Sequence, residues 1–225
     1  MRIACLHTAA SNISVFDAAA EALGVGAEVL RHEVRADLLA AAESAGQLTD
    51  DIVTSTASAL LALAQHADVV LLTCSTLGPV VEGLSTNIPI LRTDQALAAA
   101  AVRSGGNIVV LCAVETTLAA TLRLFYKAAL HSNANVEVRL VPGAWALFKA
   151  GDIEGYLATV AKAADAAYAE GIARVALGQA SMSAAAVRVT AGPAPLTSAS
   201  TGLSAALQVI GFSKAEPPSP ATPAR

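Results

Sequence analysis

Charged residues are scarce in this 225-residue chain, of which only 14% are Asp, Glu, Lys or Arg, and the formal net charge is −4. No cluster of Lys or Arg occurs along the sequence. Proteins that bind nucleic acids neutralise phosphates with such clusters. The composition therefore argues against a nucleic acid as the partner.

Long hydrophobic runs are also missing, although 55% of the residues are hydrophobic. About a quarter of the chain is alanine, a residue that favours helices more than lipid. No window approaches the roughly 18 uninterrupted apolar residues of a membrane-spanning helix. The apolar run Ile3–Leu6 is too short for the core of a signal peptide. We therefore expect a cytoplasmic protein with no membrane partner.

Cysteine is rare, and its spacing fits neither a disulfide framework nor a zinc site. The chain has three cysteines, Cys5, Cys74 and Cys112, and no CxxC motif. Four histidines are scattered without the spacing of metal ligands: His7, His32, His66 and His131. No metal is therefore expected from the sequence.

What the sequence does contain is an alternation of short β-branched runs with alanine-rich segments of helical periodicity. Such alternation is typical of parallel sheets connected by right-handed crossovers. The expected strands are residues 3–7, 27–33, 68–72, 89–91, 107–112, 135–141 and 172–178. The expected helices are residues 11–23, 37–45, 51–65, 94–103, 116–131, 152–170, 181–189 and 203–210.

The order of the elements starts again halfway along the chain, as a duplication would produce. Ile3–Leu6 lies over Ile108–Leu111 at an offset of 105, and Ala67–Leu71 lies over Ala173–Leu177 at an offset of 106. The sequence thus predicts an α/β fold of two similar lobes with parallel sheets, related by a pseudo-twofold axis, with the active-site cleft between them.

The expected lobes are residues 1–94 and 95–198, with the terminal helix in residues 199–212 packing back on the first lobe. The tail, residues 213–225, holds four of the nine prolines and is predicted to be disordered.

Ligands of open parallel sheets bind at the carboxyl ends of the strands. Four segments at these ends carry small polar side chains, and the duplication matches them in two pairs: His7–Asn12 with Cys112–Thr117, and Thr73–Gly78 with Gln179–Ala184. Hydroxyl and amide groups at helix starts suit an anion, although plain N-capping explains most such residues.

Cys74 follows an apolar strand and precedes a hydroxyl-rich turn. Free backbone N–H groups at such a position are expected to lower the pKa of a thiol toward the working pH. The alternative is a buried cysteine that packs as a small hydrophobe, which is the stronger interpretation for Cys5 within its strand.

Four short motifs, in this order, resemble the aspartate/glutamate/hydantoin racemase superfamily over nearly all of residues 1–212. They are Leu71–Thr76, the Pro89-x4-Asp94 step, Glu115–Thr117 and Gln179–Met182. The resemblance implies a cofactor-independent enzyme acting at the α-carbon of a small carboxylic acid such as an amino acid. It also implies a homodimer.

In that superfamily two cysteines, one in each lobe, serve opposite faces of the substrate α-carbon. By resemblance, Cys74 is the thiol of the first lobe. The resemblance implies that the substrate carboxylate is bound by Ser11, Asn12, Ser75, Thr76, Thr116, Thr117 and Ser181.

The second thiol is absent, because an offset of 106 places Ala180 opposite Cys74. Arylmalonate-type decarboxylases in the superfamily also use one thiol, but theirs lies in the second lobe. We therefore expect racemisation, isomerisation or decarboxylation that uses one cysteine, or else a catalytically inactive module that binds a small carboxylate.

Glu115 and His7 are the candidates for a further acid or base. Each also has a structural explanation. A glutamate in the first turn of a helix is favoured by the helix dipole, and a histidine at a strand end is often a satisfied core side chain.

Overall fold

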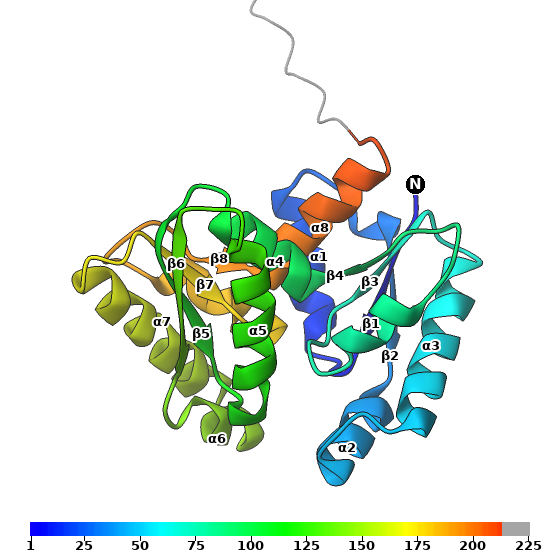
Figure 1. The fold of residues 1–225 in the computed structure, drawn as a ribbon, viewed down its shortest axis with the longest axis horizontal. Helices are drawn as coiled ribbons and strands as arrows, with labels where there is room; N and C mark the ends of the chain where they lie inside the picture. The colour runs from blue at the N-terminus through cyan, green and yellow to red at the C-terminus, as the bar shows by residue number, and fades with distance from the viewer. Residues whose placement is uncertain (213–225) are drawn as a thin grey trace, which may run out of the picture.

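Two parallel sheets of four strands each lie side by side, one at the centre of each lobe (Figure 1). The computed structural model describes residues 1–212, so the predicted disorder of residues 213–225 lies outside the described residues. The first sheet has the order β2-β1-β3-β4, with strands Leu30–Val34, Ile3–His7, Val69–Leu72 and Ile90–Arg92. The second has the order β6-β5-β7-β8, with strands Ala134–Leu140, Gly106–Cys112, Arg174–Leu177 and Leu196–Thr197.

Helices cover both faces of each sheet, which is why central strands such as β3, Val-Val-Leu-Leu, are apolar throughout. On the first sheet, α1 (Asn12–Ala22) and α8 (Ser198–Val209) pack on one face. Helices α2 (Ala36–Ala45) and α3 (Asp50–Ala64) pack on the other. The alternating α/β fold of two lobes is therefore confirmed.

The second sheet is covered in the same way. Helix α7 (Ile153–Ala169) and the 3₁₀ segment Ala180–Arg188 pack on one face. Helices α4 (Thr93–Val102) and α5 (Leu118–Ala129) pack on the other.

Several short segments differ from the sequence predictions. Ala27–Val29, predicted as the start of a strand, is a 3₁₀ turn that precedes β2. The prediction missed the helix α6 (Ala144–Lys149) and the strand β8, which are too short for a periodic pattern to show. The predicted helix at residues 181–189 is 3₁₀ rather than α. No helix within residues 1–212 has the length and apolar character of a membrane span.

The two lobes exchange helices. Helix α4 directly follows β4 of the first sheet but packs on the second sheet, whereas α8 directly follows β8 of the second sheet and packs on the first. The two helices contact each other between the sheets (Figure 1). Their contact fixes the position of one lobe relative to the other.

Gly202 of α8 makes this close contact possible. A Cβ atom at this position would lie 2.6 Å from Cγ2 and 3.3 Å from Cα of Thr93 in α4. Overpacked cores of this kind cost about 1–3 kcal/mol. We expect Gly202→Val to lower the free energy of unfolding by roughly that amount, as measured by urea denaturation.

The matched control is Gly83→Val, because a Cβ atom at Gly83 meets no atom within 4 Å. Equal losses of stability in the two variants would show that the contact between α4 and α8 is not tight.

The strand registers also give the relation between the lobes. The N–H of Thr73 donates to the carbonyl of Leu6, and the N–H of Gly178 donates to the carbonyl of Leu111. Leu111 lies 105 positions after Leu6, and Gly178 lies 105 positions after Thr73. The residue pairs between β5 and β7 likewise lie 105 positions after those between β1 and β3. Cys74 therefore corresponds to Gln179, and not to Ala180 as the offset of 106 predicted.

Candidate active site

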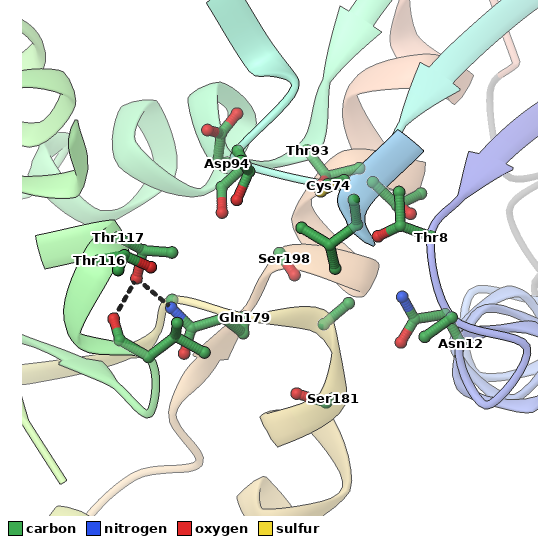
Figure 2. Close-up of a pocket in the computed structure, with 18 of the residues that line it drawn as sticks. Thr8, Asn12, Cys74, Thr93, Asp94, Thr116, Thr117, Gln179, Ser181 and Ser198 are labelled. Carbon is green, nitrogen blue, oxygen red and sulfur yellow. Dashed lines mark hydrogen bonds between the residues drawn. The ribbon is translucent and has the colours of Figure 1, made fainter. Parts of the chain in front are cut away.

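The carboxyl ends of strands from both sheets line one cavity between the lobes, here called the inner cavity (Figure 2). Its lining residues are Thr8, Ala9, Asn12, Leu39, Glu43, Thr73, Cys74, Ser75, Thr76, Thr93, Asp94, Val114, Thr116, Thr117, Trp145, Phe148, Gly178, Gln179, Ala180, Ser181 and Ser198.

Cys74 lies on the first-lobe wall of this cavity, two residues after the end of β3. Its side chain is half-buried and packs against the core between β3 and helices α2 and α3. Burial raises the pKa of the Cys74 thiol, and hydrogen bonds from the Thr8 hydroxyl and from the backbone N–H groups of Leu77 and Thr76 act in the opposite direction.

This direction differs from the expectation that free N–H groups would lower the pKa. Those N–H groups are present, but loss of water around the sulfur is the larger effect. Cys74 is therefore a protonated thiol at neutral pH, which suits a proton donor.

Iodoacetamide is accordingly expected to modify Cys74 slowly at pH 7. The rate should still be rising with pH above about 8.5, the pKa at which the rate of a free cysteine begins to level off, because the thiolate is the nucleophile. Mass spectrometry of the peptide that contains Cys74, compared at each pH with a free thiol peptide, measures this. Modification at pH 7 faster than that of the free peptide would contradict the raised pKa.

Arg92, the last residue of β4, lies beside the turn that follows Cys74, here called the Cys74 loop. A Cβ atom at Gly78 would lie 2.5 Å from Nη2 of Arg92, so a larger residue here would displace the guanidinium from its present position. Arg92 donates to both carboxylate oxygens of Asp94, at 3.0 and 2.8 Å, and to Glu82 at 3.1 Å. The charge of Asp94 in the cavity wall is thus paired.

Two buried polar atoms in the inner cavity have no hydrogen-bond partner among the described residues. They are Oδ1 of Asn12 and Oγ of Ser198. Both residues line the cavity near Cys74 (Figure 2). Since a buried polar atom without a partner is costly, these two atoms favour a polar ligand or water in the cavity.

The second-lobe wall carries Gln179, the counterpart of Cys74. Its Oε1 accepts from the N–H of Ala113 at 2.7 Å, and its Nε2 donates to Oγ1 of Thr117 at 3.0 Å. Thr117 in turn donates to the carbonyl of Val114 at 2.7 Å (Figure 2). Gln179 is therefore held by hydrogen bonds and has no proton to exchange near neutral pH.

The cavity brings together six of the seven residues expected to bind the carboxylate: Asn12, Ser75, Thr76, Thr116, Thr117 and Ser181. The hydroxyl of Ser181 is 2.9 Å from that of Tyr156. Ser11 precedes α1, is exposed and does not line the cavity.

The two additional acid or base candidates lie elsewhere. His7 is fully buried and does not line the cavity. It bonds to Oγ1 of Thr73, which does, at 2.9 Å. Glu115 is exposed and lines a second, adjoining cavity together with Thr116, Thr117, Trp145 and Lys149, here called the outer cavity.

Cys112 is fully buried at the end of β5 and does not line the inner cavity. Burial raises the pKa of its thiol. Cys74 is thus the single thiol lining the inner cavity among the described residues.

The sequence reasoning did not select several cavity residues, namely Thr8, Thr93, Gln179, Trp145 and Ser198. Thr93 and Ser198 directly follow β4 and β8, so an offset of 105 relates them. A search of every strand end, including the two shortest strands, would have found both. Trp145 lies on α6, a helix of six residues that is too short to show a periodic pattern.

Comparison with known proteins gives a match to the sequence model of the Asp/Glu/Hydantoin racemase family over residues 41–199. No curated protein matches the sequence significantly.

Several solved structures share the fold. An aspartate racemase from Picrophilus torridus is 11% identical over 93% of this chain and 94% of that one, with a TM-score of 0.73. Allantoin racemase from Pseudomonas fluorescens is 17% identical over 100% of both chains, with a TM-score of 0.64. A glutamate racemase from Bacillus anthracis is 18% identical over 94% of this chain and 83% of that one, with a TM-score of 0.62.

At these identities the structural likeness concerns the fold alone, whereas the family match covers most of the sequence. The match includes the Cys74 loop, α4, the Glu115–Thr117 turn and the strand end at Gln179. This chain belongs to the Asp/Glu/hydantoin racemase family.

Proposed function

We propose that this protein transfers a proton to one face of the α-carbon of a small carboxylic acid, with Cys74 as the donor and without a cofactor. One observation carries the proposal: among residues 1–212 a single thiol lines the cavity, and its counterpart in the second lobe is a glutamine held by hydrogen bonds. Full racemisation needs an acid or base on both faces of the carbon, so protonation of one face fits this cavity better.

Decarboxylation of a substituted malonate is the reaction that such a cavity suits best. The bond between the α-carbon and the leaving carboxylate breaks, CO₂ departs, and the electron pair stays on the α-carbon as an enediolate. The S–H bond of Cys74 then breaks as its proton bonds to that carbon. The resulting thiolate accepts hydrogen bonds from Thr8 and from the N–H groups of Thr76 and Leu77, and water returns its proton.

The remaining carboxylate would be bound without a cationic side chain, since no Lys or Arg of the described chain lines the inner cavity. Hydroxyl groups are available instead on both walls, from Ser75 and Thr76 in the first lobe and Thr116 in the second. The Ser198 hydroxyl, which has no partner among the described residues, is a further donor. Negative charge that develops on the enediolate would strengthen each of these bonds.

Exchange of the α-proton of an amino acid or a hydantoin is the related reaction that needs only the same thiol. Here Cys74 would act first as a base and then return a proton, or a deuteron from D₂O, to the same face. The raised pKa of the thiol makes it a better donor than acceptor at neutral pH, so this reaction is expected to be the slower of the two.

A proton NMR screen in D₂O tests the proposal with amino acids, hydantoins and substituted malonates as probes. Loss of an α-proton signal, or release of CO₂ with one deuteron in the product, is expected for at least one class. Saturable binding of these carboxylates without any exchange or CO₂ release would contradict proton transfer.

A further inference from the structure

A second cluster of reactive side chains lies outside the inner cavity, between the first sheet and α1. The sulfur of Cys5 and ring nitrogens of His7 and His32 all lie within 4.8 Å of one another. Cys5 and His7 are two residues apart on β1 and so share one face of the sheet. His32 is the register partner of Cys5 on the neighbouring strand β2.

The imidazole rings of His7 and His32 each turn one nitrogen toward the other ring. The second nitrogen of each ring points away from the pair. Nε2 of His7 and Nδ1 of His32 are 2.8 Å apart. The outer nitrogen of His7 bonds to Oγ1 of Thr73 at 2.9 Å, and that of His32 bonds to the carboxylate of Asp17 on α1 at 3.1 Å. Histidines that bind metals are held in this way, with the free ring N–H donated to a carboxylate or another oxygen.

We propose that Cys5, His7 and His32 form a binding site for a divalent ion of the zinc class. The ligands would be the thiolate of Cys5, Nε2 of His7 and Nδ1 of His32, a set of one sulfur and two nitrogens that zinc and cobalt accept readily. Binding forms one metal–sulfur and two metal–nitrogen bonds and releases the thiol proton of Cys5 to solvent.

Charge and distance both suit such an ion. The charge of +2 is matched by the buried Cys5 thiolate and the partly exposed Asp17 carboxylate, so the site is neutral as a whole. Ligand atoms of a tetrahedral zinc ion lie about 3.3–3.6 Å apart, given bonds of 2.0–2.3 Å. The ring nitrogens therefore need to separate by only about 0.5 Å from their hydrogen-bonded positions.

The surroundings of the cluster indicate how an ion would enter and which elements it would hold together. The side chains of His32 and Asp17 are 13% and 38% exposed, which leaves an entry from the α1 side, while Cys5 and His7 are fully buried. Thr73, which bonds to His7, precedes Cys74 and lines the inner cavity. The ion would thus fix β1, β2 and the start of the Cys74 loop as one unit.

Cobalt titration of the full-length protein, freed of metal with EDTA and kept reduced, tests the site. We expect one Co²⁺ per chain with a thiolate-to-cobalt charge-transfer band, displaced by one equivalent of Zn²⁺. The band should be lost in Cys5→Ala and retained in Cys112→Ala, an equally buried cysteine on β5. Retention in Cys74→Ser shows that the cavity thiol is not the ligand.

Of the cluster variants, Asp17→Asn should disturb folding least, because Asp17 lies at the surface end of the cluster. It should weaken Co²⁺ binding about 10–100-fold without removing the charge-transfer band, as loss of an outer partner does. A wild-type protein that gives no band, or a band of equal strength in Cys5→Ala, would overturn the proposal. The readout involves no turnover, so it is independent of the proposed reaction.

Discussion

Replacing Cys74 with alanine is expected to lower kcat/KM by about 10²–10⁴-fold, the usual contribution of a positioned acid or base. The variant loses the single thiol that lines the inner cavity in the described chain. The hydroxyl groups of Ser75 and Thr76 remain, so binding of the carboxylate should change little. Deuterium incorporation or CO₂ release, measured with the substrate found by the NMR screen, gives the rate.

Two further variants separate chemistry from folding. Cys74→Ser keeps a polar atom of similar size, but a hydroxyl is a much weaker acid than a thiol, so the variant should be as inactive as the alanine variant. Cys112→Ala removes a buried thiol that does not line the cavity and should keep its activity. Proton transfer at the wild-type rate in Cys74→Ser would reject the role of this residue.

Replacing Gln179 with cysteine is expected to add proton transfer on the opposite face of the substrate. Gln179 occupies the second-lobe position that corresponds to Cys74 in the strand registers, and both side chains line the inner cavity (Figure 2). In the variant the N–H of Ala113, which now bonds to Gln179 at 2.7 Å, is free to stabilise a thiolate. We expect formation of the second enantiomer to rise by about tenfold or more, since an unoptimised acid or base falls below the usual range.

Gln179→Ser is the matched control, because it removes the same hydrogen bonds to Ala113 and Thr117 without adding a thiol. Chiral chromatography of the product from each variant measures the enantiomer ratio. If the cysteine and serine variants give the same ratio, the second wall does not face the reacting carbon.

The sequence was sufficient to predict the order of helices and strands, because most elements have a strong local pattern. Residues 68–72 are apolar apart from Asp68, a pattern typical of a strand buried in a parallel sheet, and β3 covers Val69–Leu72. The 3₁₀ segment at Ala180–Arg188 has the same alanine-rich composition as the true helices, so composition could not distinguish them.

The offset between the lobes could not be read reliably from the sequence. Strands buried on both faces are apolar at every position, so a slip of one residue leaves the apolar pattern intact. The alanines at 67 and 173 aligned at 106, whereas the backbone bonds of Thr73 and Gly178 give 105. The slip assigned the missing thiol to Ala180 when the equivalent position holds Gln179.

The cluster of Cys5, His7 and His32 could not be predicted from the sequence for a different reason. Its spacing along the chain resembles no metal-ligand motif, because the pairing of β1 with β2 brings His32 beside Cys5. Spacing rules detect ligands within one segment, and a site assembled across two strands falls outside them.

The stereochemistry of deuterium incorporation tests most directly whether Cys74 alone delivers the proton. One pure enantiomer of the substrate, or a prochiral malonate, is incubated with the wild-type protein in D₂O. We predict one deuteron per turnover with a single configuration, retained in the case of exchange. A racemic product, or inversion as fast as retention, would show that a second group serves the opposite face and would contradict the one-thiol account.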